Sequence, residues 1–161
     1  MKTKVNNMSF EITKEADKYL NKLNRNSKSG SLDIDWDFYY ICALVGMYYR
    51  RLNSEIKDDE LRELTRSFPQ KYHDKKFYII ALLIESEIHR KGVETRTRKE
   101  LEKFMLKKVE EGETGLSENG EELLNKYAAG GLEIIKEKIG RVEDLHVFFI
   151  RLYEDILNVK K

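Results

Sequence analysis

The sequence predicts an all-α fold, a compact single-domain bundle of six or seven helices around two buried helices. Apolar residues recur at helical spacing, 37% of the residues are charged, and a single proline leaves few places where a helix must end. The two most apolar segments, about 36–52 and 74–91, are expected at its centre. A length of 161 residues suits one domain. We therefore expect a flexible N-terminus over 1–8 and a single helical domain over 9–161.

The most apolar segment is 36–52, with the sequence WDFYYICALVGMYYRRL. It is apolar on almost every side of a helix, which is typical of a helix covered by several neighbours. Its aromatic and β-branched residues would also suit a strand, but ~17 residues exceed the usual strand length. Asp33 or Asp35 is expected to cap its start, and Arg50 and Arg51 suit the negative end of the helix dipole.

Two helices flank this segment along the chain. The first is expected over about 10–25, with Ser9 or Thr13 as its N-cap. A short helix is expected over about 58–65, because three acidic residues open it. It ends before Pro69, since the residue that precedes proline avoids helical backbone angles.

The second buried helix, about 74–91, carries an apolar stripe and ends at Gly92, a suitable C-cap. The residues expected to face the core are Phe77, Ile80, Ala81, Ile84 and Ile88, widened by Tyr78 and Leu82.

Two further helices are predicted from caps and spacing. One runs over about 98–111 and is capped by Thr95 or Thr97. The last helix of the chain begins at Asp144 and runs to about Asn158.

Between them lies a long helix over about 118–138, capped by Ser117 and interrupted by Gly130 and Gly131. Each glycine costs a helix about 1 kcal/mol relative to alanine. We attribute this pair to close packing against the 36–52 helix. A hinge, or a groove for a partner segment, is the alternative interpretation.

Charge and cysteine content limit the function. The net charge is +1, from 30 basic and 29 acidic residues, so nucleic-acid binding would need a local basic patch. Cys42 is the one cysteine and lies within the apolar segment, where burial would suppress its reactivity. With no apolar signal core and no stretch long enough to span a bilayer, we expect a cytoplasmic protein without a membrane partner.

The sequence offers one weak candidate for a metal or enzymatic site. Glu85 and His89 are four residues apart and share a helical face. The segment ESEIH lacks the second histidine of a zinc-protease helix, and no third ligand can be named. We favour an ion pair near a helix end, and we predict no catalytic residue, metal or cofactor.

A second candidate is the basic loop around 90–99, which holds five cations and one anion around a glycine turn. Such a loop could contact phosphates or an acidic protein, or serve only solubility. The candidate binding residues, for protein or phosphate, are Arg90, Lys91, Arg96, Arg98 and Lys99, together with Arg50 and Arg51 from the end of the central helix.

Two short segments, Phe38–Gly46 and Asn125–Glu133, carry a resemblance to a known group. They resemble an aromatic helix and a late Tyr-Ala-x-Gly-Gly helix in small helical accessory proteins. Those proteins are encoded beside DNA phosphorothioation and related phage-defence systems. The tyrosine-rich second half of the first segment departs from that pattern, and no functional residue is carried over. The resemblance implies a non-enzymatic component of a DNA-modification or restriction assembly.

The sequence therefore predicts a non-catalytic protein-interaction module, bound to another protein or to copies of itself. It would be an accessory component of a DNA-modification or phage-defence assembly. Direct nucleic-acid binding through the basic loop 90–99 is the first alternative. A metal-dependent enzyme centred on Glu85 and His89 is the second.

Overall fold

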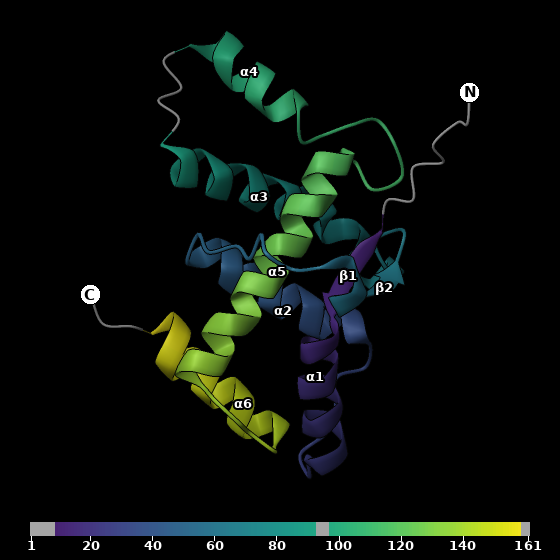
Figure 1. The fold of residues 1–161 in the computed structure, drawn as a ribbon, viewed down its shortest axis with the longest axis vertical. Coiled ribbons are helices and arrows are strands. Elements are labelled where there is room, and N and C mark those ends of the chain that lie inside the picture. Colours follow the sequence, from purple (N-terminus) through teal and green to yellow (C-terminus); the bar gives the residue numbers. More distant parts are fainter. Residues whose placement is uncertain (1–8, 93–96, 159–161) are drawn as a thin grey trace.

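The computed structural model describes residues 9–92 and 97–158. The expectations for 1–8, Thr95 and Arg96 lie outside these residues. The described part holds six α-helices and a two-stranded sheet, so a mostly helical fold is confirmed but the fold is not strictly all-α (Figure 1). In chain order the elements are β1 (Phe10–Thr13), α1 (Lys14–Asn26), α2 (Asp35–Tyr48), η1 (Asp58–Glu60), β2 (Leu61–Thr65), η2 (Gln70–Lys75), α3 (Lys76–Lys91), α4 (Arg98–Leu106), α5 (Glu118–Lys138), α6 (Leu145–Arg151) and η3 (Leu152–Leu157).

The sheet replaces parts of two predicted helices. β1 takes up the start of the helix expected over 10–25, and β2 takes up most of the one expected over 58–65. The strands are antiparallel, with Thr13 opposite Leu61. Phe10 and Ile12 are both buried, so the start of the chain follows the two-residue period of a strand. Helix α1 then begins after Thr13, whose hydroxyl accepts the Ala16 N–H at 3.1 Å.

Helix α2 begins one residue earlier than predicted, and its cap differs from the prediction. Ile34 is the N-cap, and the Asp37 carboxylate accepts its N–H at 3.4 Å. Neither Asp33 nor Asp35 is the cap residue. The buried Asp37 carboxylate also accepts the Tyr72 hydroxyl, which joins the start of α2 to η2.

Helices α2 and α5 cross at backbone contact in the middle of the molecule (Figure 1). A Cβ atom on Gly46 would overlap the carbonyl of Tyr127, and one on Gly131 would overlap the carbonyl of Cys42. A Cβ on Gly130 would meet the backbone of the segment after α2. The close packing assigned to the glycine pair is therefore confirmed. The predicted interruption at Gly130 and Gly131 is wrong, because α5 runs through both.

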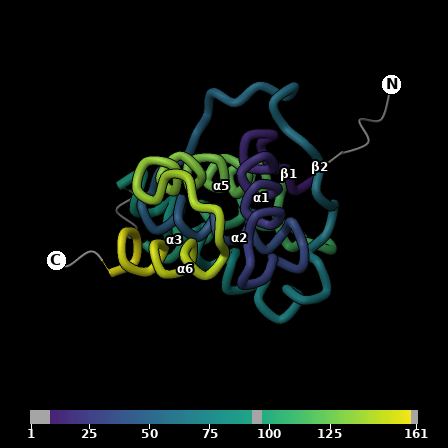
Figure 2. The backbone as a smooth tube through the Cα atoms, turned by 90° about the horizontal axis from the view of Figure 1, so that it is seen from below, coloured from purple at the N-terminus to yellow at the C-terminus, as the bar shows by residue number. Residues whose placement is uncertain are grey.

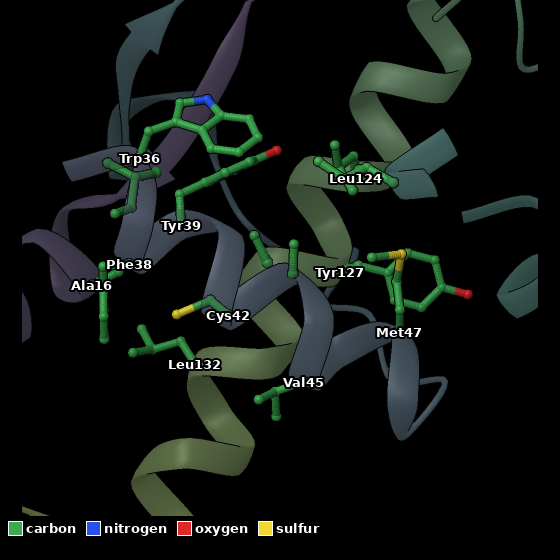
Figure 3. Packing of buried hydrophobic residues seen from close by; sticks show 14 of the residues in the cluster. Ala16, Trp36, Phe38, Tyr39, Cys42, Val45, Met47, Leu124, Tyr127 and Leu132 are labelled. Carbon is green, nitrogen blue, oxygen red and sulfur yellow. The ribbon is translucent and has the colours of Figure 1, made fainter. Parts of the chain in front are cut away.

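The core lies around this crossing. Figure 3 shows Tyr39, Cys42 and Val45 of α2 among Leu124, Tyr127 and Leu132 of α5. Cys42 is 2% exposed, and burial raises the pKa of its thiol, as expected for a core cysteine. Within the described residues, no helix combines the length and the apolar content that crossing a bilayer requires.

Helix α3 is not the main partner of α2, in contrast to the prediction. Because α5 covers one side of α2, α3 contributes a narrower face, formed by Ile79, Ile80, Leu83 and Ile84. Three residues predicted to be buried are exposed instead: Phe77 at 70%, Tyr78 at 74% and Leu82 at 38%. The exposed Ala81 departs from the prediction in the same way. The apolar stripe of α3 is therefore wider than the core beneath it.

The last elements follow their predicted caps, with shorter helices. Thr97 caps α4, which ends at Leu106, before the predicted end at residue 111. Asp144 caps α6 and accepts the N–H groups of His146 and Val147. The last helix then changes to a π-helix, η3, in which the Asn158 N–H donates to the Tyr153 carbonyl at 2.7 Å.

Replacing Gly131 with alanine should destabilise the fold by at least about 2 kcal/mol, because the added methyl group overpacks the contact between α5 and the Cys42 carbonyl. Helix propensity alone would give the opposite sign, a gain of about 1 kcal/mol. Denaturant unfolding measures the sign directly. Gly112→Ala is the control, since no atom lies within 4 Å of the site of its Cβ. A more stable Gly131→Ala protein would contradict the crossing.

Candidate functional site

An apolar groove of about 440 Å³ lies between α2, α3 and η3. Helix α2 forms one side of it, while α3 and η3 supply the rest of the lining. We call it the α2–α3 groove. Its lining residues are Ile41, Leu44, Val45, Met47, Tyr48 and Arg50 from α2 and its end, Leu82, Glu85, Ser86 and His89 from α3, and Leu152 and Leu157 from η3.

The groove is held in shape by polar contacts between its walls. The Ser86 hydroxyl donates to the Met47 carbonyl at 3.3 Å, which fixes α3 against the last turn of α2. The Tyr49 hydroxyl donates to the Ile156 carbonyl at 3.0 Å, which fixes η3 against the same turn. Figure 2, seen from below, shows α3 and α6 on the same side of α2. The groove is therefore a preformed feature of the fold.

Arg50 stands at the edge of the groove in an unusual backbone conformation. Its φ is 54°, the only positive φ of a non-glycine residue in the described part of the chain. The Arg50 N–H donates to the Met47 carbonyl, and the Arg51 N–H donates to the Gly46 carbonyl. This is a Schellman ending of α2, in which glycine usually occupies the position of Arg50. Placing a side chain there costs about 1–2 kcal/mol.

Glu85 and His89 of α3 line the groove together with Arg50. Glu85 and His89 are 3.8 Å apart, at the spacing of the predicted ion pair, and both are well exposed. No third metal-binding side chain joins them among the residues that the structure describes. The pair therefore places charged and polar groups at the rim of the groove. Two side chains alone do not complete a metal-binding site.

Exposed aromatic rings continue the apolar surface beyond the groove. Tyr48 is 60% exposed on its rim. Tyr78 is one turn before Leu82 on α3, and Tyr153 is one turn before Leu157 in η3; both rings are more than half exposed. Surfaces of this kind commonly mark interaction sites.

The two arginines at the end of α2 have different surroundings. Arg51 turns to α5, where its guanidinium pairs with Glu133 at 2.9 Å and Glu137 at 2.8 Å. Arg50 lies instead on the groove that His89 also lines. The salt bridges of the described residues include Arg51, Arg90 and Arg98 but not Arg50. Arg50 is therefore the available cation of this pair.

The first cations of the basic loop are engaged within the protein. Glu87 is fully buried and pairs with Arg90 at 2.7 Å and with Lys91 at 3.7 Å. The Tyr127 hydroxyl donates to the same carboxylate at 2.8 Å. Burial alone would raise the pKa of Glu87, but the hydrogen bonds from Arg90 and Tyr127 outweigh it and lower the pKa.

The remaining loop residues are scattered. Arg98 pairs with Glu102 on α4 at 2.8 Å, and Lys99 is exposed. Arg96 lies outside the described residues. Lys108 is 2% exposed, with its ammonium 4.2 Å from the centroid of the Phe104 ring. The basic segment thus contains cations that are paired with carboxylates of the protein and others, such as Lys99, that are exposed to solvent.

Sequence reasoning found parts of this site but did not assemble it. Arg50, Glu85 and His89 were all singled out, and the structure brings them to one groove. The apolar wall was missed, because Leu82 was assigned to the core. One signal in the sequence could have indicated this wall. The segment 36–52 is apolar on almost every side, so a second apolar face remains after one neighbouring helix has covered the first.

No protein-family model matches this chain, and comparison with curated proteins and with solved structures gives no match.

Arg50→Gly should raise the free energy of unfolding by about 1 kcal/mol, because glycine adopts the left-handed conformation at the end of α2 without steric cost. Arg50→Ala keeps a Cβ atom and serves as the control, with no comparable gain expected. Thermal or denaturant unfolding measures both. A loss of stability in Arg50→Gly would show that the Arg50 side chain stabilises the fold, against our interpretation.

Glu87→Gln should lower the free energy of unfolding at pH 7 by about 2 kcal/mol, because the buried ionised hydrogen bonds are weakened. The pKa of Glu87 is lower in the folded chain than its ordinary value of 4.5. Its ionised form therefore contributes stability above that value, and the contribution is lost as the pH falls through the folded pKa. The difference between wild type and variant should shrink in acid.

Denaturant unfolding between pH 7 and pH 3 tests this pattern. Glu85→Gln, two residues away and exposed, is the matched control and should change stability little at any pH. A difference between wild type and Glu87→Gln that stayed constant with pH would contradict the role given to the ionised carboxylate.

Proposed function

We propose that the protein is a non-catalytic protein-interaction module that binds its partner through the α2–α3 groove. The observation that carries this proposal is the groove itself, an apolar depression of about 440 Å³ that opens to the surface beside the exposed Tyr48. A hydrophobic centre with aromatic and arginine residues at its edge has the composition of protein-binding sites.

The chemistry of the groove favours recognition over reaction. The Ser86 hydroxyl is buried and donates to a backbone carbonyl. A nucleophile needs an adjacent base within hydrogen-bond reach, and the side chains of Glu85 and His89 face each other at the rim. Apolar side chains form most of the remaining wall. These features support binding by burial of apolar surface.

The π-helix η3 supports the same proposal. π-Helical turns are rare and occur frequently at functional sites. Here the wider turn belongs to the element that places Leu152 and Leu157 on the groove.

A role as an accessory component of a DNA-modification or phage-defence assembly remains a further prediction from the resemblance of 38–46 and 125–133. The two segments pack against each other at the α2–α5 crossing. Their glycines are therefore explained by helix packing, and the resemblance bears on the fold more than on a binding site.

Direct nucleic-acid binding through the loop 90–99 is the alternative proposal. Lys99 and the other residues at the start of α4 are exposed, which supports this alternative. The pairing of Arg90 and Lys91 with Glu87 reduces the charge left for phosphates. Such binding would weaken steeply with salt and would be lost in Arg96→Glu combined with Arg98→Glu.

Leu82→Glu should abolish partner binding, because it places a charge on the apolar wall of the groove. Leu106→Glu is the matched control, since Leu106 is 70% exposed on α4 and lines no part of the groove. The measurement is co-purification from the native cells, with each tagged protein expressed at the same level and its melting temperature recorded.

The proposal predicts a specific partner that is present with wild type and Leu106→Glu and absent with Leu82→Glu. Size-exclusion chromatography of the purified chain tests the case in which a second copy is the partner. The proposal would be wrong if Leu82→Glu retained every partner of the wild type, or if the folded wild type remained monomeric and without a partner.

A further inference from the structure

We infer that the α2–α3 groove accepts an amphipathic helix that carries an acidic residue at the end nearest Arg50. This inference rests on the proposed function and names the chemical class of the partner. It follows from the shape of the groove, from the elements that form it, and from the charge at one end.

The walls of the groove restrict the kind of segment that can bind. The lining comes from α2, α3, η3 and Arg50, two residues after the end of α2, and neither strand contributes to it. The backbone groups within helices are already hydrogen-bonded, so the groove offers no strand edge for an extended peptide. Recognition must therefore use side chains, as when an amphipathic helix lies in a hydrophobic groove.

The groove and the exposed ring beyond it extend along about three turns of α3. Leu82 to His89 covers eight residues, or about 10 Å at the helical rise, and Tyr78 lies one turn before Leu82. On the opposite side, exposed Tyr153 and Leu157 follow each other at one-turn spacing in η3. A small apolar molecule in the groove would leave these outer tyrosines uncovered, whereas a helix would cover them.

The charge at the rim determines which end of the partner helix should carry the acidic residue. Arg50 is exposed and takes no part in the salt bridges among the described residues, while its neighbour Arg51 is paired with two glutamates. Glu85 is the one acidic residue of the lining, and it faces His89 at 3.8 Å. His89 balances the charge of Glu85 only when its ring is protonated, so the lining also holds a negative charge. The Arg50 guanidinium has no carboxylate partner among the described residues and therefore suits a carboxylate of the partner.

The backbone at Arg50 strengthens this assignment. Position 50 has a left-handed conformation that glycine would adopt without strain, and arginine there is not needed to end α2. The side chain is therefore available to a partner, and its removal to glycine should not unfold the protein. This makes Arg50 a recognition residue that can be tested without loss of the groove.

A peptide library provides the test. The probe is a display library of alanine-rich helical peptides of roughly four turns, randomised on one face and at both ends. It is selected against wild type and counter-selected against Leu82→Glu. The inference predicts selected peptides with apolar residues at helical spacing and an Asp or Glu near one end. Exchanging that acid for lysine should weaken binding to wild type about threefold to tenfold.

The Arg50 variants decide the role of the charge. The preference for the acid should fall below about twofold in Arg50→Gly and return in Arg50→Lys. Arg25→Gln, an exposed arginine at the end of α1 outside the groove, should behave as wild type. Groove-dependent peptides without an acidic preference would overturn the inference and leave the proposed function standing. If no selected peptide depended on Leu82 for binding, the inference would be wrong, and the groove would no longer support the proposed function.

Discussion

The backbone contact between α2 and α5 is the constraint on which the rest of the fold depends. Gly46 and Gly131 allow each helix to approach the carbonyl groups of the other, at positions where a methyl group could not fit. Such an approach gives the tyrosines and aliphatic residues of α2 a close surface on one side. It also explains why α5 tolerates two adjacent glycines that weaken a helix in isolation.

The crossing also determines where the apolar groove forms. Because α5 occupies one side of α2, the opposite face is left to α3 and η3, which meet it through Met47 and Tyr49 but do not close over it. The two arginines that follow α2 lie on different sides of it, one toward α5 and the other at the groove. Arg51 is tied to α5, and Arg50 is left at the groove. One helix thus links the core of the molecule to its candidate binding surface.

The sequence predicted much of the helical fold, because caps and periodicity are local signals. Thr97, Ser117 and Asp144 all cap the helices assigned to them, and Gly92 ends α3 in a left-handed conformation. Strand β1 was missed because four residues are too few to separate a two-residue period from a helical one. The exposure of Tyr78 could not be predicted either, since periodicity identifies an apolar face without showing whether another helix covers it.

The candidate site was predictable only in fragments for the same reason. Glu85 and His89 were found from their spacing, and Arg50 from its place at a helix end, but their meeting depends on how α2 and α3 pack. The sequence of the loop 90–99 shows five cations but not which of them are paired within the protein. The buried Glu87 that pairs with Arg90 lies on the same helix, yet its burial is a tertiary property.

The most direct test of the central claim is site-specific photo-cross-linking in the cells that make the protein. A photoreactive amino acid would replace Tyr48 at the rim of the groove or, in a matched control, Leu106 on α4. The account predicts a discrete protein adduct from position 48 that is absent from position 106 and is lost when Leu82→Glu is added. Equal adducts from both positions, or none from position 48, would contradict it.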